Sequence, residues 1–405
     1  MAYFAFCESK FVRLIRLPTH DLGSKWVARN GNNTIQEKYR MQLKRKCGLS
    51  MTQTSEFLWY IPNQTNAGHR GDTAVEGHNS LDTLTIQAKA LEDHGWKGAL
   101  IGTGWGRPDT FTVATALTAR TKSFEPLIAI RPGYWRPANF ASAAATLDHL
   151  SDGRVRINIV SGQDNLAAYG DSEGNQAHRY GRTKEFMRLI RRLWTEEKVS
   201  FEGEHFQVTD STVEPRLHAN GDRHHPKLYF GGASEAAERV SATEADVQLF
   251  WGEPLDGVRE RIERLKKLSK DLDRDLAPLQ FGLRITTFVR DTTEQAWTDA
   301  EAKVAEMAKA STTDRDHRRW VAVGQRRLLD LQEKGDVLDD NLYTAPGKFG
   351  GGGAGTTWLV GSAEDVANSL KKYRDLGITH FVLSDTPYLN EIKRQGDQLL
   401  PLLRD

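Results

Sequence analysis

The sequence predicts an α/β protein folded as a (β/α)8 TIM barrel with insertion segments, including a mobile lid before the eighth strand. Eight short, almost continuously apolar runs recur along the chain, and segments with helical periodicity separate them. Apolar runs without alternation are typical of parallel strands buried on both faces. Eight is the number of strands that closes such a barrel. An open doubly wound sheet is the alternative, but its glycine-rich first turn is missing from the sequence.

The expected elements follow one another in regular alternation. The strands are "FLWYI" (57–61), "GALIGT" (98–103), "PLIAIR" (126–131), "RINIVSG" (156–162), "KLYFGG" (227–232), "DVQLFWG" (246–252), "LQFGLRITTFV" (279–289) and "HFVLSD" (380–385). The helices are expected over 81–95, 110–121, 139–153, 179–194, 235–245, 256–272, 291–310 and 362–377. The first helix should end at Gly95, because glycine readily takes the left-handed conformation that closes a helix.

Residues 1–50 differ in composition from the remainder. They hold ten Lys or Arg against three Asp or Glu, and they contain both cysteines, Cys7 and Cys47. We interpret 1–50 as an N-terminal extension outside the fold and 51–405 as the barrel domain, with Met51 as a natural start. The extension lacks the apolar core of a secretory signal, and an organelle-targeting segment is the less favoured alternative. A domain without cysteines indicates a reducing, cytoplasmic compartment.

The overall composition excludes several partner classes. A formal net charge of +1 with 39% hydrophobic residues describes a soluble protein with no general affinity for nucleic acid or anionic membranes. No stretch approaches the roughly 18 consecutive apolar residues that span a bilayer.

Two insertions interrupt the alternation. Residues 195–226 contain "VSFEGEHFQV", whose alternating pattern predicts a short hairpin. Residues 310–357 are rich in Arg, Asp and Gly, and a stretch of this length is typical of a lid or a disordered segment. It ends in "KFGGGGAGTTWLVG" (348–361), where four glycines, 350–353, precede a strand-like run. A phosphate-binding loop would need a helix after the glycines, so a hinge is the favoured interpretation.

Ligands of a barrel bind at the carboxyl ends of its strands. Those ends are residues 63–64, 103–107, 131–135, 161–164, 231–234, 251–253, 284–287 and 384–388, which are rich in Trp, Arg and small hydroxyl side chains. They contain no His, Asp or Glu group at metal-ligand spacing, so no metal is expected. The adjacent His224 and His225 precede a proline and predict a turn.

A strand, two glycines and a helix start occur in "YFGGASEAAE" (229–238). The free N–H groups of a helix start suit a phosphate, and Ser234 would add a hydroxyl; a simple helix cap at Ser234 is the equal alternative. "NIVSG" (158–162) ends another strand, and "HRYGR" (178–182), with Tyr180, opens the following helix. Together these segments could line a mononucleotide site.

The chain resembles the bacterial luciferase-like flavin monooxygenases, and most closely their FMNH2-dependent alkanesulfonate branch and the related dimethyl sulfone enzymes. The resemblance rests on "FLWYIPNQ", "AIRPGYWRPANFASAAATLDHLSDGRVRINIVSG", "RYGRTKEF", "VSFEGEHFQV", "PKLYFGGASEAA", "FWGEP", "FGLRITTFVRDT" and "GGAGTTWLVGSAEDVANSLKKYRDLGITHFVLS", and it covers nearly all of 56–404. It implies reduced FMN supplied in trans by an NAD(P)H-dependent FMN reductase. It also implies O2-dependent cleavage of a C–S bond that gives sulfite and an aldehyde.

The resemblance also implies roles for individual residues. The expected flavin contacts are Tyr180, Ala233 and Ser234 at the phosphate, Thr103, Arg131 and Ser161 at the ring, and Gln176, where the family usually has a histidine. Arg284 matches the arginine that holds the sulfonate, and a guanidinium fork suits sulfonate oxygens better than an ammonium. Trp251 and Arg107 complete the candidate catalytic set.

Four positions depart from the alkanesulfonate pattern. Thr286, Thr386, Arg107 and Gly351 stand where that branch has His, Tyr, Cys and Arg. The candidate substrate contacts are Gln64, His69, Trp105, Trp135 and Arg136, which offer stacking faces and many donors. They favour a bulkier, hydroxylated sulfonate such as sulfoquinovose, although rim tryptophans could equally serve packing.

Three alternatives to a sulfonate monooxygenase stay open. They are a dimethyl sulfone-type or other luciferase-like monooxygenase, a non-catalytic flavin-binding subunit, and the F420-dependent hydride-transfer branch. We expect the chain to form a homo-oligomer, either a dimer or a tetramer.

Overall fold

The computed structural model describes residues 3–8, 11–16, 54–64, 77–162, 164–171, 175–218, 223–310, 323–349 and 356–404. The chain divides into two compact units, Met1–Thr54 and Ser55–Asp405. In the first unit, β1 (Tyr3–Glu8) pairs antiparallel with β2 (Phe11–Arg16).

The second unit is a closed barrel of eight parallel strands, which confirms the predicted fold class. The strands are β3 (Glu56–Ile61), β4 (Gly98–Ile101), β5 (Glu125–Ile130), β6 (Arg156–Ile159), β9 (Leu228–Gly231), β10 (Val247–Trp251), β11 (Gln280–Val289) and β15 (Ile378–Ser384). Each strand pairs with the next, and parallel pairings of β11 with both β10 and β15, and of β15 with β3, close the ring. The doubly wound alternative is thereby excluded.

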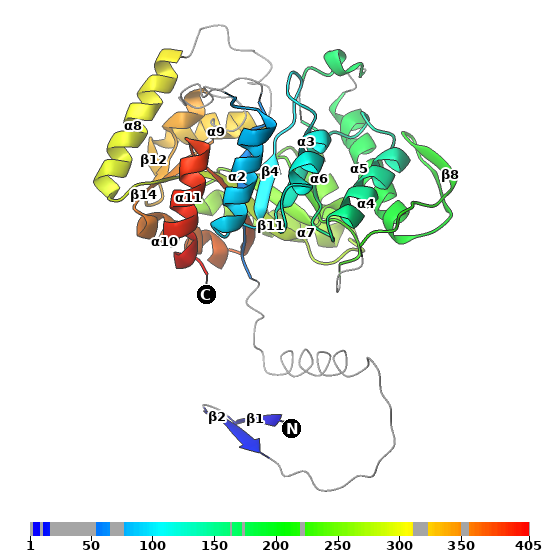
Figure 1. Ribbon diagram of the computed structural model, residues 1–405, viewed down its shortest axis with the longest axis horizontal. Coiled ribbons are helices and arrows are strands. Elements are labelled where there is room, and N and C mark those ends of the chain that lie inside the picture. The colour runs from blue at the N-terminus through cyan, green and yellow to red at the C-terminus, as the bar shows by residue number, and fades with distance from the viewer. Residues whose placement is uncertain are drawn as a thin grey trace. The chain divides into compact units, whose positions relative to one another are not determined.

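Helices surround the strands (Figure 1). They are α2 (Leu81–Asp93), α3 (Thr110–Thr118), α4 (Pro137–Leu150), α5 (Gln176–Thr195), α6 (Glu235–Glu244), α7 (Leu255–Asp271), α8 (Thr293–Ala310), α9 (Val323–Lys334), α10 (Ala363–Asp375) and α11 (Tyr388–Gln398). Polar caps start several of them; the Ser80 hydroxyl, for example, accepts from the Thr83 N–H at α2. Gly95, at φ +82°, follows the end of α2 as predicted. The sequence interpretation missed α9 and α11.

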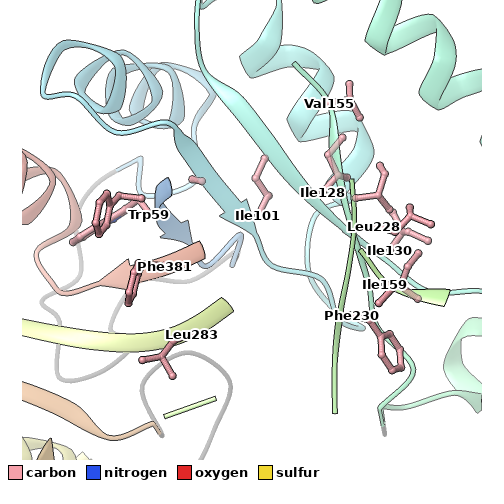
Figure 2. Close-up of a cluster of buried hydrophobic side chains, with 14 of the residues drawn as sticks. Trp59, Ile101, Ile128, Ile130, Val155, Ile159, Leu228, Phe230, Leu283 and Phe381 are labelled. Atoms are coloured by element: carbon pink, nitrogen blue, oxygen red, sulfur yellow. The ribbon is translucent and has the colours of Figure 1, made fainter. Parts of the chain in front are cut away.

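Two apolar layers hold the barrel together. The outward-facing side chains of the strands pack against the helices, including Trp59, Ile128, Phe230 and Leu283 (Figure 2). The second layer comprises Leu58, Tyr60, Leu100, Leu127, Ala129, Tyr229, Val247, Leu249 and Val382. These residues alternate with the first set along the strands, so they fill the barrel interior. Apolar residues on both faces explain why the strands lack alternation in the sequence.

The two insertions have different outcomes. The predicted hairpin is present as β7 (Val199–Glu202) and β8 (Gln207–Ser211). The irregular segment expected over 310–357 is wrong for 323–349, which forms α9, β12 (Val337–Leu338), β13 (Leu342–Tyr343) and a 3-10 turn (Ala345–Phe349). β13 pairs antiparallel with β14 (Trp358–Gly361), which itself extends the sheet beside β11. The glycine run and its expected hinge lie outside the described residues.

Burial of apolar side chains explains why residues 323–349 of the second insertion form regular structure. Leu328 of α9 and Leu342 and Tyr343 of β13 are buried, which supplies the apolar area that stabilises a local fold. The charged residues between them masked this short apolar pattern in the sequence.

A chain that begins at Met51 should keep its melting temperature and the fold of the barrel, because β3 begins only at Glu56. The measurement is a thermal melt of the truncated and full-length chains side by side. A melting temperature several degrees lower for the truncated chain would contradict the assignment of residues 1–50 to an extension.

Candidate functional site

Several predicted residues meet at the carboxyl end of the barrel. Trp251 ends β10, and it lies opposite Arg284 of β11 in the parallel register. Trp251 lies an even number of positions from the interior residues Val247 and Leu249 of its own strand. Arg284 lies two positions from Gly282, where a Cβ would meet Leu249. The side chains of Trp251 and Arg284 therefore belong to the barrel interior. The Arg284 guanidinium carbon lies 4.1 Å from the centre of the Tyr60 ring. A cation over an aromatic face is stabilised by the ring quadrupole.

A cavity of about 410 Å³ opens between the loops that follow β4 and β5, and its lining includes neither Arg284 nor Trp251. Five of the predicted site residues line it: Thr103, Trp105, Arg107, Arg131 and Trp135. Arg107 Nη1 donates to the carbonyl of Pro62 at 2.7 Å and so joins the loop after β4 to the loop after β3. Arg131 is buried, and its Nη1 donates to the carbonyl of Gly162 at 2.7 Å.

Asp164 organises this cavity and was missed as an individual residue in the sequence. One oxygen, Oδ2, accepts from the backbone N–H of Trp105 at 3.1 Å and lies 3.1 Å from Nη2 of Arg131. Burial, and then the nearby negative charge of Asp164, raise the pKa of the Tyr169 hydroxyl. A single carboxylate therefore holds three loops in place. Only proximity in the fold reveals this role, because Trp105 and Arg131 are far from Asp164 in sequence.

An aromatic cluster covers one side of the cavity. The rings of Tyr134 and Tyr169 stack with centroids 4.2 Å apart, and Trp105 meets Tyr169 edge-on at 4.9 Å. Burial raises the pKa of Tyr134 to about 12, so this hydroxyl stays protonated at neutral pH. Trp105 is 52% exposed despite its size. Large aromatic side chains held at a rim in this way offer a flat apolar surface to a ligand.

The turn between β9 and α6 forms a second part of the site. Ser234 caps α6, its hydroxyl accepting from the Ala237 N–H at 3.3 Å. Gly232 has φ +150°, and a Cβ there would lie 2.6 Å from the Ala237 Cβ and 3.9 Å from the Tyr180 hydroxyl. Glycine is therefore required at this position, and the Tyr180 hydroxyl lies beside the turn. The cap expected at Ser234 is present, which leaves a phosphate role compatible with it.

Some buried polar atoms at this end of the barrel have no hydrogen-bond partner within the described part of the chain. They are Nε of Arg131, Oδ1 of Asn158 and the indole Nε1 of Trp251. Buried polar groups are almost always hydrogen-bonded, so these atoms are available to a polar ligand. Asn158 was not singled out in the sequence.

Comparison with known proteins identifies the chain. The model of the luciferase-like monooxygenase family matches residues 55–380. The chain belongs to the luciferase-like monooxygenase family.

Solved structures share the fold of this chain. A riboflavin lyase with modified FMN and substrate riboflavin has TM-score 0.68 and 18% identity, covering 86% of this chain and 91% of its own. A long-chain alkane monooxygenase has TM-score 0.68 and 15% identity, with coverage of 87% and 92%. The EDTA monooxygenase of Chelativorans sp. BNC1 has TM-score 0.68 and 15% identity, with coverage of 86% and 93%. At such low identity these likenesses establish the shared fold alone.

The remaining predicted residues of this luciferase-like monooxygenase are dispersed. Ser161 is turned toward α5, its hydroxyl 2.6 Å from that of Thr183. Gln176 is exposed at the first turn of α5, and Arg136 forms the N-cap of α4 without a side-chain bond to that helix. Gln64 follows β3 and is partly exposed. His69 lies outside the described residues.

Within the ranges that the structure describes, no group of three His, Cys, Asp or Glu side chains could hold an ion. The ring of His225 stacks on Trp194 with centroids 6.3 Å apart.

None of the described helices has the length and apolar character needed to cross a bilayer.

Proposed function

We propose that the chain is an FMNH2- and O2-dependent monooxygenase that cleaves the C–S bond of an organosulfonate. Written for a primary sulfonate, the reaction takes sulfonate, FMNH2 and O2 to aldehyde, bisulfite, FMN and water. The observation that carries the proposal is Arg284 at the carboxyl end of the barrel, beside Tyr60 and Trp251. A guanidinium in a partly buried aromatic setting suits a sulfonate, because its planar fork matches two oxygens at once.

The residues present fit reduced FMN. Ser234, Ala233 and the N-terminus of α6 would hold the phosphate together with the Tyr180 hydroxyl, since helix starts favour anions. Arg131 and Thr103 would face the ring system, where the unpartnered Arg131 Nε offers a donor. When bound, reduced FMN supplies the electrons for splitting O2.

The protein's own residues would orient the substrate and exclude water. Arg284 would hold the sulfonate, while the Trp251 indole N–H and Arg107 supply further donors. Trp105, Trp135 and Tyr169 provide flat apolar surface beside the polar groups. That combination favours a bulky hydroxylated sulfonate such as sulfoquinovose, because sugar rings stack on aromatic faces while their hydroxyls need donors. Gln64, His69 and Arg136 are further candidate contacts.

The proposal also assigns a partner. We expect a separate NAD(P)H-dependent FMN reductase to deliver the flavin, and we expect the chain to act in the cytoplasm as a homodimer or homotetramer. A dimethyl sulfone-type or other luciferase-like monooxygenase is the second candidate, because Thr286, Thr386, Arg107 and Gly351 replace the residues of the alkanesulfonate branch.

Sulfite release tests the proposal. The full chain is combined with FMN, NADPH, a purified flavin reductase and a panel of linear, aromatic and sugar sulfonates. We expect sulfite from at least one sulfonate, with the sugar sulfonate preferred, and no NADPH oxidation by the chain alone. NADPH oxidation without the reductase would contradict supply in trans. Oxygenation of dimethyl sulfone with no sulfite from any sulfonate would favour the second candidate.

A further inference from the structure

A buried arginine of α7 donates a hydrogen bond to the turn that precedes α6. Arg261 of α7 is 2% exposed, and its Nη2 donates to the carbonyl of Gly232 at 2.6 Å. Gln248 of β10 donates to the same carbonyl through Nε2 at 3.2 Å. We propose that Arg261 is a positioning residue that orients the Gly232–Ala233 peptide for binding the flavin phosphate. The inference rests on the proposed function, which assigns the phosphate to this turn.

Arg261 is fixed in place by its other contacts. Its Nε lies 3.0 Å from Oε1 of Glu238, on α6, and its Nη1 lies 2.7 Å from Oε1 of Glu253, just after β10. Its guanidinium carbon lies 4.7 Å from the centre of the Phe250 ring. A side chain bound on three sides cannot follow the turn if the turn moves. The arginine therefore defines where the Gly232 carbonyl must point.

The orientation of the Gly232 carbonyl also sets the orientation of the N–H group that would face the phosphate. In a trans peptide the carbonyl and the N–H of the same unit point in opposite directions. Because the Gly232 carbonyl faces Arg261, the N–H of Ala233 faces away from Arg261. The bond to a guanidinium also polarises the peptide, which strengthens the N–H as a donor to an anion. Arg261 thus acts on a phosphate without touching it.

The conformation of Gly232 allows this orientation. Its φ of +150° is one that residues with a side chain rarely adopt, and a Cβ would collide with Ala237 of α6. The turn is consequently free of side-chain bulk toward α6, and two donors hold its carbonyl. A sequence pattern of two glycines before a helix does not reveal these donors, because they come from β10 and α7.

The test compares flavins with and without a phosphate. Reduced FMN and reduced riboflavin are titrated anaerobically into the wild-type full chain, Arg261→Gln and Arg264→Gln, with tryptophan fluorescence as the readout. Arg264 is the matched control, because it pairs with the same Glu238 at 2.8 Å but is half-exposed. We expect the preference for FMN over riboflavin to fall about tenfold in Arg261→Gln, the size of one hydrogen bond to a charged group, and to stay unchanged in Arg264→Gln.

A merely structural role for Arg261 predicts a different pattern, with both flavins weakened equally and their ratio preserved. That result would overturn the inference. Because Arg261→Gln leaves two buried carboxylates short of a partner, Gln248→Met provides a second variant that removes a donor to Gly232 without exposing a charge. It should lower the same ratio severalfold, and an unchanged ratio would also overturn the inference. A wild-type chain that binds reduced FMN and reduced riboflavin equally would instead overturn the phosphate site of the proposed function.

Discussion

Arg284→Ala should lower kcat/KM for the sulfonate by on the order of a hundredfold or more. Removing one partner of a desolvated charge pair typically costs roughly 2–5 kcal/mol, and each 1.36 kcal/mol corresponds to a factor of about ten in rate. Arg284 lies over Tyr60 at the carboxyl end of the barrel, where the ligand site of this fold is located. The measurement is steady-state sulfite release together with sulfite yield in a single turnover.

Two comparisons separate substrate binding from other effects. Arg284→Lys should recover little activity, because an ammonium cannot reproduce the bidentate fork. Arg259→Ala serves as control, since Arg259 is an exposed arginine on the outer helix α7, paired with Asp256, and it should leave kcat/KM unchanged. Affinity for reduced FMN should change far less than kcat/KM in either Arg284 variant. A near-normal sulfite yield from Arg284→Ala would remove this residue from the mechanism and weaken the sulfonate assignment.

Arg156→Met should reduce the free energy of unfolding by about 3–5 kcal/mol, the usual cost of breaking a buried ion pair by removing one partner. Arg156 is 8% exposed at the amino end of the barrel, where its Nε donates to Glu125 at 2.6 Å and its Nη1 contacts Glu56. Its Nη1 also donates to the Tyr229 hydroxyl at 2.8 Å. Without the guanidinium, both partly buried carboxylates lose a charged donor. Chemical denaturation at pH 7 measures the loss.

The matched control for this variant is Lys97→Met. Lys97 Nζ lies 2.7 Å from the same Glu125, but its side chain is 52% exposed, so its loss should cost at most about 1 kcal/mol. Equal losses in the two variants would contradict the view that burial decides the effect. Flavin binding per folded molecule should be unchanged in both, because this end of the barrel lies opposite the site.

The pH dependence of the Arg156 effect has a defined sign. Burial opposes ionisation of Glu56, yet the hydrogen bond from His380 and the charge of Arg156 outweigh it and lower the pKa of this carboxyl. A lowered folded-state pKa contributes stability that is present above the unfolded pKa, near 4.3, and is lost as pH falls toward the folded value. The difference between Arg156→Met and wild type should therefore be largest at neutral pH and shrink below about pH 5. A difference that grows on acidification would contradict this.

The strands could be predicted because each one satisfies a local rule. A run such as 126–131 is apolar at every position, and β5 covers Glu125–Ile130 with all but its first residue buried. Such a pattern reports burial on both faces without any knowledge of neighbours. The segment 323–349 failed the same test, because its burial depends partly on other elements: the buried Tyr343 ring lies 5.4 Å from that of Trp297 and 6.2 Å from that of Trp358.

Residues of the candidate site could be predicted from the sequence only in part. Thr103, Trp105, Arg107, Arg131 and Trp135 were found because they follow strands, and the barrel gathers strand ends into one cavity. Asp164 and Arg261 were not predicted, because their roles depend on the residues that they contact in the folded chain. Asp164 joins Trp105 to Arg131, and Arg261 reaches Gly232 from a helix that lies later in the chain.

The sequence by itself determined the barrel, the order of its strands and the presence of a glycine turn before α6, because periodicity, apolar runs and turn residues act over a few positions. The tertiary structure alone decided which polar groups are buried and which donors meet at each carbonyl. Hydrogen bonds and ion pairs depend on distances of about 3 Å, and only the closed barrel brings Arg261, Gln248 and the Gly232 carbonyl within that range.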